Sequence, residues 1–178
     1  PRHLRLEIPG RLSADGEEVL ALDLASVDAA ADFLLEEGCE AIAICFLHSY
    51  SNHEHEQKTA ERVRHLYPHI AVAASHELIG EWREFERTST TVMDSYLAPV
   101  VHKYLETLVN SMADRLPGGG LHVMESNGGV MSAASASETP LQTLLSGPVG
   151  GATGGRALSM ATGRPNLICV DMGGTSFD

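Results

Sequence analysis

The sequence predicts an α/β protein in which short strands alternate with helices and the sheet is largely parallel. Two apolar runs, 41–47 and 70–74, carry this prediction. The first is nearly unbroken, which is typical of a strand covered on both faces. The segments that flank it, about 26–37 and 51–66, have the hydrophobic spacing of helices. No internal repeat of solenoid period is visible.

The first elements can be predicted from turn and cap signals. Segments 4–12 and 19–22 are predicted strands around Asp15-Gly16, a hairpin signal. Ser26 is the predicted N-cap of the helix that runs to about residue 37, and Gly38 is its predicted stop. Ser51 and Glu54 have the spacing of a capping box, so the next helix is predicted to begin there.

A long helix is predicted over about 84–116. Apolar residues recur every four positions along it and predict a buried stripe: Val92, Tyr96, Val100, Tyr104, Leu108 and Met112. Pro99 lies inside this helix, so we expect a kink or a split there. A loop is predicted at 117–120.

Three glycine-dense stretches dominate the rest of the chain. A short strand at 121–125 is predicted to run into the first, 126–129, and a helix or turn over 140–145 precedes the second, 146–155. Helix is predicted only from residue 156 to residue 161. The run 167–170 is predicted to be a buried strand that enters the third stretch, 173–176.

The third stretch has the composition of a phosphate-binding loop. Gly173 and Gly174 allow a tight reversal with unobstructed amides, and successive free amides bind anions. Thr175 and Ser176 add hydroxyl donors. Asp171 stands at the strand end, where a carboxylate can hold Mg²⁺ beside a phosphate. It is therefore the predicted metal ligand and the predicted catalytic residue. The alternative is an ordinary strand followed by a turn.

The other two stretches are predicted to meet the third around one phosphorylated ligand, because ligands of open α/β sheets bind beyond the carboxyl ends of strands. Any one of the stretches alone is also explained as a tight turn. The residues predicted to line this cleft are Ser126, Asn127, Gly128, Gly129, Ser146, Gly147, Gly150 and Gly151.

Composition and missing motifs exclude several classes of function. Lys and Arg number 12 against 24 Asp and Glu, a net charge of −12, which disfavours a nucleic-acid partner. No apolar run has the length of a membrane span. The three cysteines fit neither a disulfide framework nor a zinc spacing, and free thiols in a reducing cytoplasm are expected. The P-loop, dinucleotide and nucleophile-elbow motifs are absent.

Two polar clusters have a structural and a functional interpretation. His48, His53 and His55 suggest a metal cluster, but His53 and His55 should diverge on a helix, so a metal site is disfavoured. The segment 82–91 is either a solvated helix start with pairs such as Arg83 and Glu86 or the Arg/Thr-lined wall of a substrate cleft. The solvated face is the favoured interpretation.

Taken together, a set of motifs in a fixed order resembles the hydantoinase A/5-oxoprolinase family. This family includes N-methylhydantoinase A, ATP-dependent 5-oxoprolinase and the acetone carboxylase β subunit, and the resemblance covers the chain from about residue 39. The motifs are Cys45-Phe46-Leu47-His48-Ser49-Tyr50 with His55-Glu56, Ser75-His76-Glu77, the run 83–91, Ser126-Asn127-Gly128-Gly129, Leu145-Ser146-Gly147-Pro148 with Gly150-Gly151, and 171–176.

The resemblance implies a ribonuclease-H-like, actin-like ATPase fold, ATP with Mg²⁺, a cyclic amide substrate and a partner of the hydantoinase B type. Residues 1–165 then belong to the ATPase domain, and 166–178 form the first strand and phosphate loop of its second half. The family's first phosphate loop is not in this sequence, which starts without Met, so we expect a piece of a longer, cytoplasmic protein. Activation of a ketone, or a non-catalytic actin-like nucleotide-binding module, are the alternatives.

Overall fold

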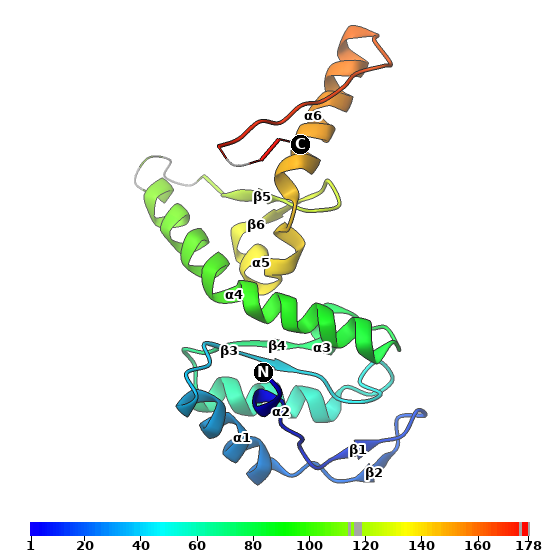
Figure 1. The fold of residues 1–178 in the computed structure, drawn as a ribbon, viewed down its shortest axis with the longest axis vertical. Helices are drawn as coiled ribbons and strands as arrows, with labels where there is room; N and C mark the ends of the chain where they lie inside the picture. Colours follow the sequence, from blue (N-terminus) through cyan, green and yellow to red (C-terminus); the bar gives the residue numbers. More distant parts are fainter. Residues whose placement is uncertain (114, 116–118, 175, 178) are drawn as a thin grey trace. The chain divides into compact units, whose positions relative to one another are not determined.

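The computed structural model describes residues 1–113, 115, 119–174, 176 and 177, and it divides into two compact units. The first unit is Pro1–Val100 and the second is Val101–Asp178. Figure 1 labels the α-helices and strands of both units. The α/β class predicted from the sequence is confirmed, because helices and strands are present in each unit.

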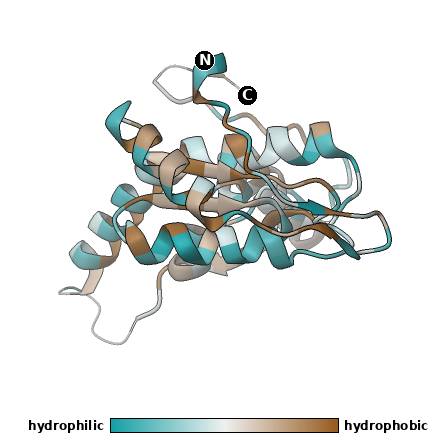
Figure 2. Ribbon diagram, turned by 90° about the horizontal axis from the view of Figure 1, so that it is seen from below, coloured by the Kyte–Doolittle hydropathy of each residue, from teal (hydrophilic) through white to brown (hydrophobic). Residues whose placement is uncertain are grey.

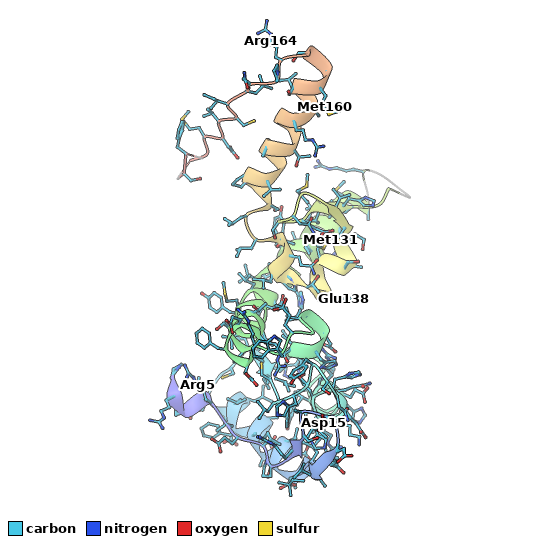
Figure 3. All side chains as sticks on the ribbon, turned by 90° about the vertical axis from the view of Figure 1, so that its right-hand side faces the viewer. Arg5, Asp15, Met131, Glu138, Met160 and Arg164 are labelled. Carbon is cyan, nitrogen blue, oxygen red and sulfur yellow. The ribbon has the colours of Figure 1, made fainter. Side chains whose placement is uncertain are left out.

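The first unit begins with a short 3-10 turn, η1 (Arg2–Leu4), and a hairpin. Strands β1 (Arg11–Leu12) and β2 (Glu18–Leu20) pair antiparallel around the turn that holds Asp15, which is labelled in Figure 3. The hairpin predicted at Asp15-Gly16 is therefore confirmed, with strands shorter than expected. Gly16 has φ +84°, which favours glycine at this position.

Helix α1 (Leu24–Glu36) is capped by Asp23, so the predicted cap at Ser26 is wrong. The Asp23 carboxylate accepts hydrogen bonds from the amides of Ala25 and Ser26 at 3.0 and 3.3 Å. Ser26 instead donates its hydroxyl to the same carboxylate at 2.6 Å. This hydroxyl, and then the Ser26 amide, lower the pKa of Asp23. Gly38 follows the helix at φ +78°, as predicted for its stop.

A parallel pair of strands forms the centre of the first unit. Strands β3 (Ala41–Ile44) and β4 (Ala71–Ala74) pair in register, with Ala41 opposite Ala71. Helices α1 and α2 (Glu54–Leu66) lie on one face of this pair, and the first part of α4 (Glu84–Ala113) lies on the other (Figure 1). The buried core between the pair and α1 and α2 is Val27, Ala31, Ile42, Ile44, Ala60, Val63 and Ala74.

The start of α2 differs from the predicted capping box. His53 occupies the N-cap and makes no side-chain cap bond. The side-chain oxygen of Asn52 accepts a hydrogen bond from the Glu54 amide at 2.9 Å. Asn52 therefore provides the side-chain cap predicted for Ser51. Asn52 is also held by the hairpin, because its amide group donates to the Gly16 carbonyl at 2.8 Å.

Helix α4 buries the face opposite to the predicted stripe, so the predicted stripe is wrong. Tyr96 is 81% exposed and Val92, Val100 and Tyr104 are also exposed. The face turned toward the core carries Arg87, Thr91, Asp94, Ser95 and Ala98. These buried positions recur every three or four residues, with Asp94 and Ser95 side by side, which is the spacing of one helix face. The helix runs through Pro99 without a break, so it is not split.

The second unit is built from the part of α4 that begins at Val101, a hairpin and further helical segments, around a small core. Strands β5 (His122–Met124) and β6 (Val130–Ser132) pair antiparallel. They are followed by α5 (Ala133–Glu138) and the 3-10 turn η2 (Pro140–Thr143), as expected for 140–145. Leu105, Met131 and Ala136 form the core. Of the strand pairs that the structure describes, only β3–β4 is parallel, so the expectation of a largely parallel sheet is wrong.

Two further expectations for the second unit are wrong. Helix α6 (Ser146–Thr162) begins ten residues before the predicted start and includes the whole second glycine stretch. The run 167–170 is not a strand, and Ile168 is 93% exposed. Within the described part of the chain no strand pairs with this run, so its backbone lacks the ladder bonds that define a strand.

Figure 2 shows hydrophobic and hydrophilic bands alternating along the helices, and no described helix is both long and apolar enough to cross a bilayer.

The inverted burial of α4 gives a direct test with two adjacent residues of the second unit. Leu105 is 2% exposed in the small core, whereas Tyr104 is 63% exposed. We expect Leu105→Ala to cost about 2–5 kcal/mol of unfolding free energy, because it leaves a cavity. Tyr104→Ala should change it by less than about 0.5 kcal/mol. Urea unfolding of both variants checks this, and equal losses would contradict the burial pattern.

Candidate functional site

The third glycine stretch forms the tight reversal that its composition predicts. Met172 and Phe177 form an antiparallel bridge, and the Gly173 amide donates to the Ser176 carbonyl at 3.0 Å. Around Gly173 and Gly174 there is open space where a side chain would stand. Asp171 is exposed at the entry to this turn. Thr175 lies outside the described residues. The turn therefore leaves a carboxylate and an uncrowded glycine backbone open to solvent.

The first glycine stretch is the hairpin turn between β5 and β6, and most of its donors already have partners. The amide and hydroxyl of Ser126 both donate to the Gln142 carbonyl, at 2.7 and 2.6 Å. The Gly128 amide donates to the Glu125 carbonyl at 3.1 Å, and the Gly129 amide donates to the Asn127 side chain at 2.7 Å. Gly128 has φ +91° and so needs to be glycine. These bonds explain the turn without a ligand.

The second glycine stretch is the first half of α6. Its N-cap is Leu145, a non-glycine residue in the left-handed region at φ +59°, which makes no side-chain cap bond. No acidic residue lies in the first turn. Helix N-termini carry unpaired amides and partial positive charge, and the dipole favours anions there. Ser146 and Gly147 thus lie at a helix start that none of the described side chains caps.

The structure brings the first and second stretches together. A Cβ placed on Gly128 would stand 3.5 Å from the Thr153 hydroxyl and 3.7 Å from Val149. A Cβ on Gly150 would stand 3.8 Å from Met124 of β5. The segment that leads to the third stretch also contacts α6, because the Cys169 sulfur occupies the space that a Gly155 side chain would need. Gly147 and Gly151 face open space.

The structure also contains a cluster of polar side chains at the carboxyl ends of β3 and β4, which the sequence analysis did not predict. Its centre is Glu56 of α2, whose side chain is fully buried. One carboxylate oxygen accepts the Phe46 amide at 3.3 Å, the Ser75 amide at 3.1 Å and the Ser75 hydroxyl at 2.7 Å. The other oxygen accepts a hydrogen bond from the His76 amide at 3.2 Å and lies 3.2 Å from the ring Nδ1 of His76. One carboxylate thereby joins the segments that follow both strands.

Arg87 of α4 fixes the same loop from the opposite side. Its guanidinium donates to the Phe46 carbonyl at 2.6 Å and to the Glu81 carbonyl at 3.2 Å, and it lies over the Tyr50 ring. Phe46 thus stands between a buried carboxylate and a buried guanidinium. The nearby Cys45 thiol has its pKa raised by burial, against weaker opposing hydrogen bonds from Thr91 and Thr88.

These contacts correct the favoured interpretation of segment 82–91. The predicted pair of Arg83 and Glu86 is present at 3.6 Å on the exposed face. Arg87 and Thr91, however, are buried rather than solvated. The signal that identifies them is the Arg-x-x-x-Thr spacing, which places both side chains on one helix face, and not the local abundance of charge.

The three histidines considered for a metal cluster point to different partners. His55 is buried, with Nε2 2.7 Å from a Glu18 carboxylate oxygen. His53 stacks on His76, with ring centroids 5.0 Å apart and an interplanar angle of 9°. His48 lies beside Tyr50. Across the described residues, no three metal-ligating side chains are grouped closely enough to hold an ion.

Comparison with known protein families gives two matches to this chain. The model of the hydantoinase/oxoprolinase family matches residues 87–178, and that of the hydantoinase/oxoprolinase N-terminal region matches residues 1–67. Together these matches cover the three glycine-rich stretches, β3, Glu56 and Arg87, whereas β4 lies between the two matches. The chain belongs to the hydantoinase/oxoprolinase family.

Two relatives show the breadth of this family. Caprolactamase subunit alpha of Pseudomonas jessenii is 39% identical over 100% of this chain and 26% of its own length. A 5-oxoprolinase of Saccharomyces cerevisiae is 33% identical over 88% of this chain and 12% of its own length. The chain therefore spans about a quarter or less of the length of these relatives.

Solved structures agree with the sequence comparison. The ATP-dependent caprolactamase of Pseudomonas jessenii matches with a TM-score of 0.84, at 38% identity over 99% of this chain and 26% of that one. Nucleotide-free acetone carboxylase matches with a TM-score of 0.86, at 32% identity over 99% and 25% of the two chains. The α/β architecture is thus that of hydantoinase-type ATPases, consistent with part of an actin-like fold.

The hydantoinase/oxoprolinase motifs of the first unit converge on one place. The segment 45–50, the pair His55-Glu56 and the segment 75–77 all lie around the Glu56 carboxylate. Arg87, within the motif 83–91, completes the set. These residues are far apart in the sequence, and they meet because parallel strands end at the same edge of a sheet.

The Glu56 carboxylate should be essential to the first unit. A glutamine at this position offers one oxygen and one amino group, so at least two of the five donors lose their acceptor. We expect Glu56→Gln to cost about 3–5 kcal/mol of unfolding free energy, the range for breaking a buried charged network. Glu77→Gln removes an exposed pair with Arg64 and should cost less than about 1 kcal/mol. Chemical denaturation of both variants measures the difference, and equal values would refute the role of Glu56.

Neighbouring glycines of α6 should respond in opposite ways to alanine. Gly154 faces open space, so Gly154→Ala should stabilise the helix by about 0.5–1 kcal/mol. Gly155→Ala gains the same propensity but must displace the Cys169 sulfur, so it should lower stability instead. Thermal melts of the two variants give the signs. Stabilisation by both would show that Cys169 does not pack on α6.

Proposed function

We propose that this chain is part of an ATP-dependent hydrolase of cyclic amides, in which ATP phosphorylates the carbonyl oxygen of a lactam or hydantoin before water opens the ring. The observation that carries the proposal is the exposed reversal at 172–177, which follows Asp171 and has open space at both glycines. The caprolactamase and the 5-oxoprolinase among the relatives support the substrate class.

The residues at the reversal suit a metal-bound phosphate in their chemistry. An exposed carboxylate next to glycine amides is the donor set that Mg²⁺ and a phosphate require. Bound Mg·ATP would supply the phosphoryl group. In this proposal Asp171 orients the metal, and Gly173, Gly174, Thr175 and Ser176 hold phosphate oxygens, because phosphoryl transfer depends mainly on positioning and charge neutralisation. The Gly173 amide would exchange its bond to Ser176 for one to the phosphate.

The other glycine stretches contribute in two ways. The uncapped start of α6, at Ser146 and Gly147, offers amides to an anion, and Gly150 and Gly151 leave that helix slim enough for a close approach. The hairpin turn at 126–129 supports α6 through Gly128, which lies near Thr153 and Val149 of that helix, while the Asn127 side chain bonds within the turn. Its occupied donors give it a supporting role in the cleft.

The domain assignment and the partner are parts of the same proposal. Residues 1–165 belong to one part of the ATPase domain, and 166–178 open its second half. A partner of the hydantoinase B type completes the enzyme in the cytoplasm. The names of relatives that are subunits, such as caprolactamase subunit alpha, support an assembly with other chains.

A ketone-activating enzyme is the second candidate. It is favoured by one observation, the TM-score of 0.86 to acetone carboxylase, which is slightly above that to caprolactamase. Both candidates use the same phosphate chemistry at Asp171. An assay of ATP-dependent turnover by the intact complex against lactams, hydantoins and ketones separates them.

The role of Asp171 is tested by a substitution that removes charge and keeps volume. We expect Asp171→Asn in the intact complex to lower Mg·ATP-dependent turnover by at least about 100-fold, because the metal loses its anionic ligand. The melting temperature should stay unchanged, since Asp171 is exposed. Asp15→Asn, an exposed residue of the β1–β2 turn, is the control. Retained turnover in Asp171→Asn would remove the phosphate loop from this position.

A further inference from the structure

The second unit contains a groove that the proposed phosphate chemistry does not use. It has a volume of about 690 Å³ and lies between the last part of α4, the residues just before β5 and the start of α5. Every residue that lines it falls between His102 and Ser137, so the second unit forms the groove alone. Sites for small molecules commonly have volumes of roughly 300–1,000 Å³. The groove therefore has the size of a small-molecule site.

An apolar stripe of α4 forms one side of the groove. Leu105, Val109 and Met112 are four and three residues apart, which places them on one face of the helix. Leu105 is 2% exposed and also belongs to the small core of the second unit, so the core fixes this stripe in place. An alkyl chain laid along the stripe leaves water, which is favourable.

A polar stripe of α4 runs beside the apolar one. His102, Glu106 and Asn110 recur every four residues and also line the groove. The described residues that line the groove include Glu106 but neither Lys nor Arg. Within the described part of the chain, the Glu106 carboxylate forms no hydrogen bond or ion pair. The stripe therefore offers a negative charge that lacks a partner of opposite sign.

His102 supplies a second acceptor to the same stripe. Its Nε2 lies 2.5 Å from the Ser137 carbonyl oxygen, and a carbonyl oxygen can only accept, so Nε2 carries the proton. In the neutral ring the lone pair is then on Nδ1. Together with Glu106, the stripe presents two acceptors to a ligand. A primary ammonium group is complementary to them, because it carries a positive charge and three donors and has no acceptor.

We propose that this groove binds a primary ammonium group on a short alkyl chain. The ammonium pairs with Glu106 and donates to Nδ1 of His102, while the chain lies along Leu105, Val109 and Met112. Two kinds of molecule carry this chemistry, namely a free alkylamine and the amino acid that opening of a lactam ring would release. The binding itself requires neither ATP nor the turn at 171–176.

Binding is measured on the intact subunit that contains this chain, by titrations followed with saturation-transfer difference spectra. Hexylammonium, hexanol and hexanoate are the probes, because they share the chain length and differ in charge. We expect hexylammonium to bind at least about 5-fold more tightly than the other two, since it alone is opposite in charge to Glu106. Added salt should weaken its binding, because the Glu106 side chain is exposed.

The two sources of the ammonium group are separated with 6-aminohexanoate. Tighter binding of this amino acid than of hexylammonium would identify the ring-opened product as the ligand. Weaker binding would identify a free alkylamine, because the added carboxylate would then be unfavourable near Glu106. Either result supports the ammonium site.

Three variants test the groove itself. Glu106→Gln keeps the volume and removes the charge, so it should weaken hexylammonium binding at least about 5-fold and leave hexanol binding unchanged. Ala134→Trp, at an exposed lining position of α5, should fill the groove and weaken the binding of both probes. Glu138→Gln is the matched control, because Glu138 ends α5, is exposed and lies outside the lining (Figure 3). Melting temperatures should be unchanged in Glu106→Gln and Glu138→Gln.

Three results would overturn the proposal. Equal affinity of the wild-type subunit for the three probes would show that charge plays no part, and this comparison needs no variant to fold. Unchanged hexylammonium binding in Glu106→Gln would remove the carboxylate from the site. Equal weakening by Glu138→Gln would show that the acidic protein attracts cations at no particular place.

Discussion

The buried carboxylate of Glu56 is the interaction on which the first unit depends. A charge without solvent must be compensated, and here five hydrogen-bonding groups from two segments of the chain supply the compensation. Those segments follow β3 and β4, so the carboxylate fixes the carboxyl edge of the parallel pair. Arg87 supplies the opposite charge on the far side of Phe46. The resulting network is costly to disturb, because removing the Glu56 carboxylate leaves several buried donors without an acceptor.

The same constraint explains why α4 is oriented with polar residues inward. Arg87 must reach Phe46, and Thr91 follows it on the same helix face, where its hydroxyl donates to the Arg87 carbonyl at 2.8 Å. Once this face is fixed, the residues on the other side of the helix, including Phe85 and Tyr96, are exposed. Hydrogen bonding therefore overrides the hydrophobic pattern, which by itself predicts the reverse orientation.

The second unit is organised by small residues rather than by buried charge. Gly128 and Gly150 allow the hairpin and α6 to approach closely, and Gly155 makes room for Cys169. Figure 3 shows Met131 in the hairpin and Met160 and Arg164 at the far end of α6, where the Ser159 hydroxyl donates to the Arg164 carbonyl at 2.7 Å. A helix with five glycines in its first ten residues has poor intrinsic propensity. Its formation reflects packing against β5 and the chain that returns along it.

The sequence by itself determined the elements with strong local signals. The β1–β2 hairpin, the strands β3 and β4, and the bodies of α1, α2 and α4 follow from Asp15-Gly16, two apolar runs and helical periodicity. The motifs also identified the family and the reversal at 172–177, since glycine conformation is a local property. Tertiary structure decided the rest. Asp23 rather than Ser26 caps α1, α6 forms through glycines, and the run 167–170 lacks a strand partner, because each depends on a neighbour that periodicity does not specify. The convergence of Glu56, His76 and Arg87 needed the parallel register of β3 and β4, which brings distant segments to one edge.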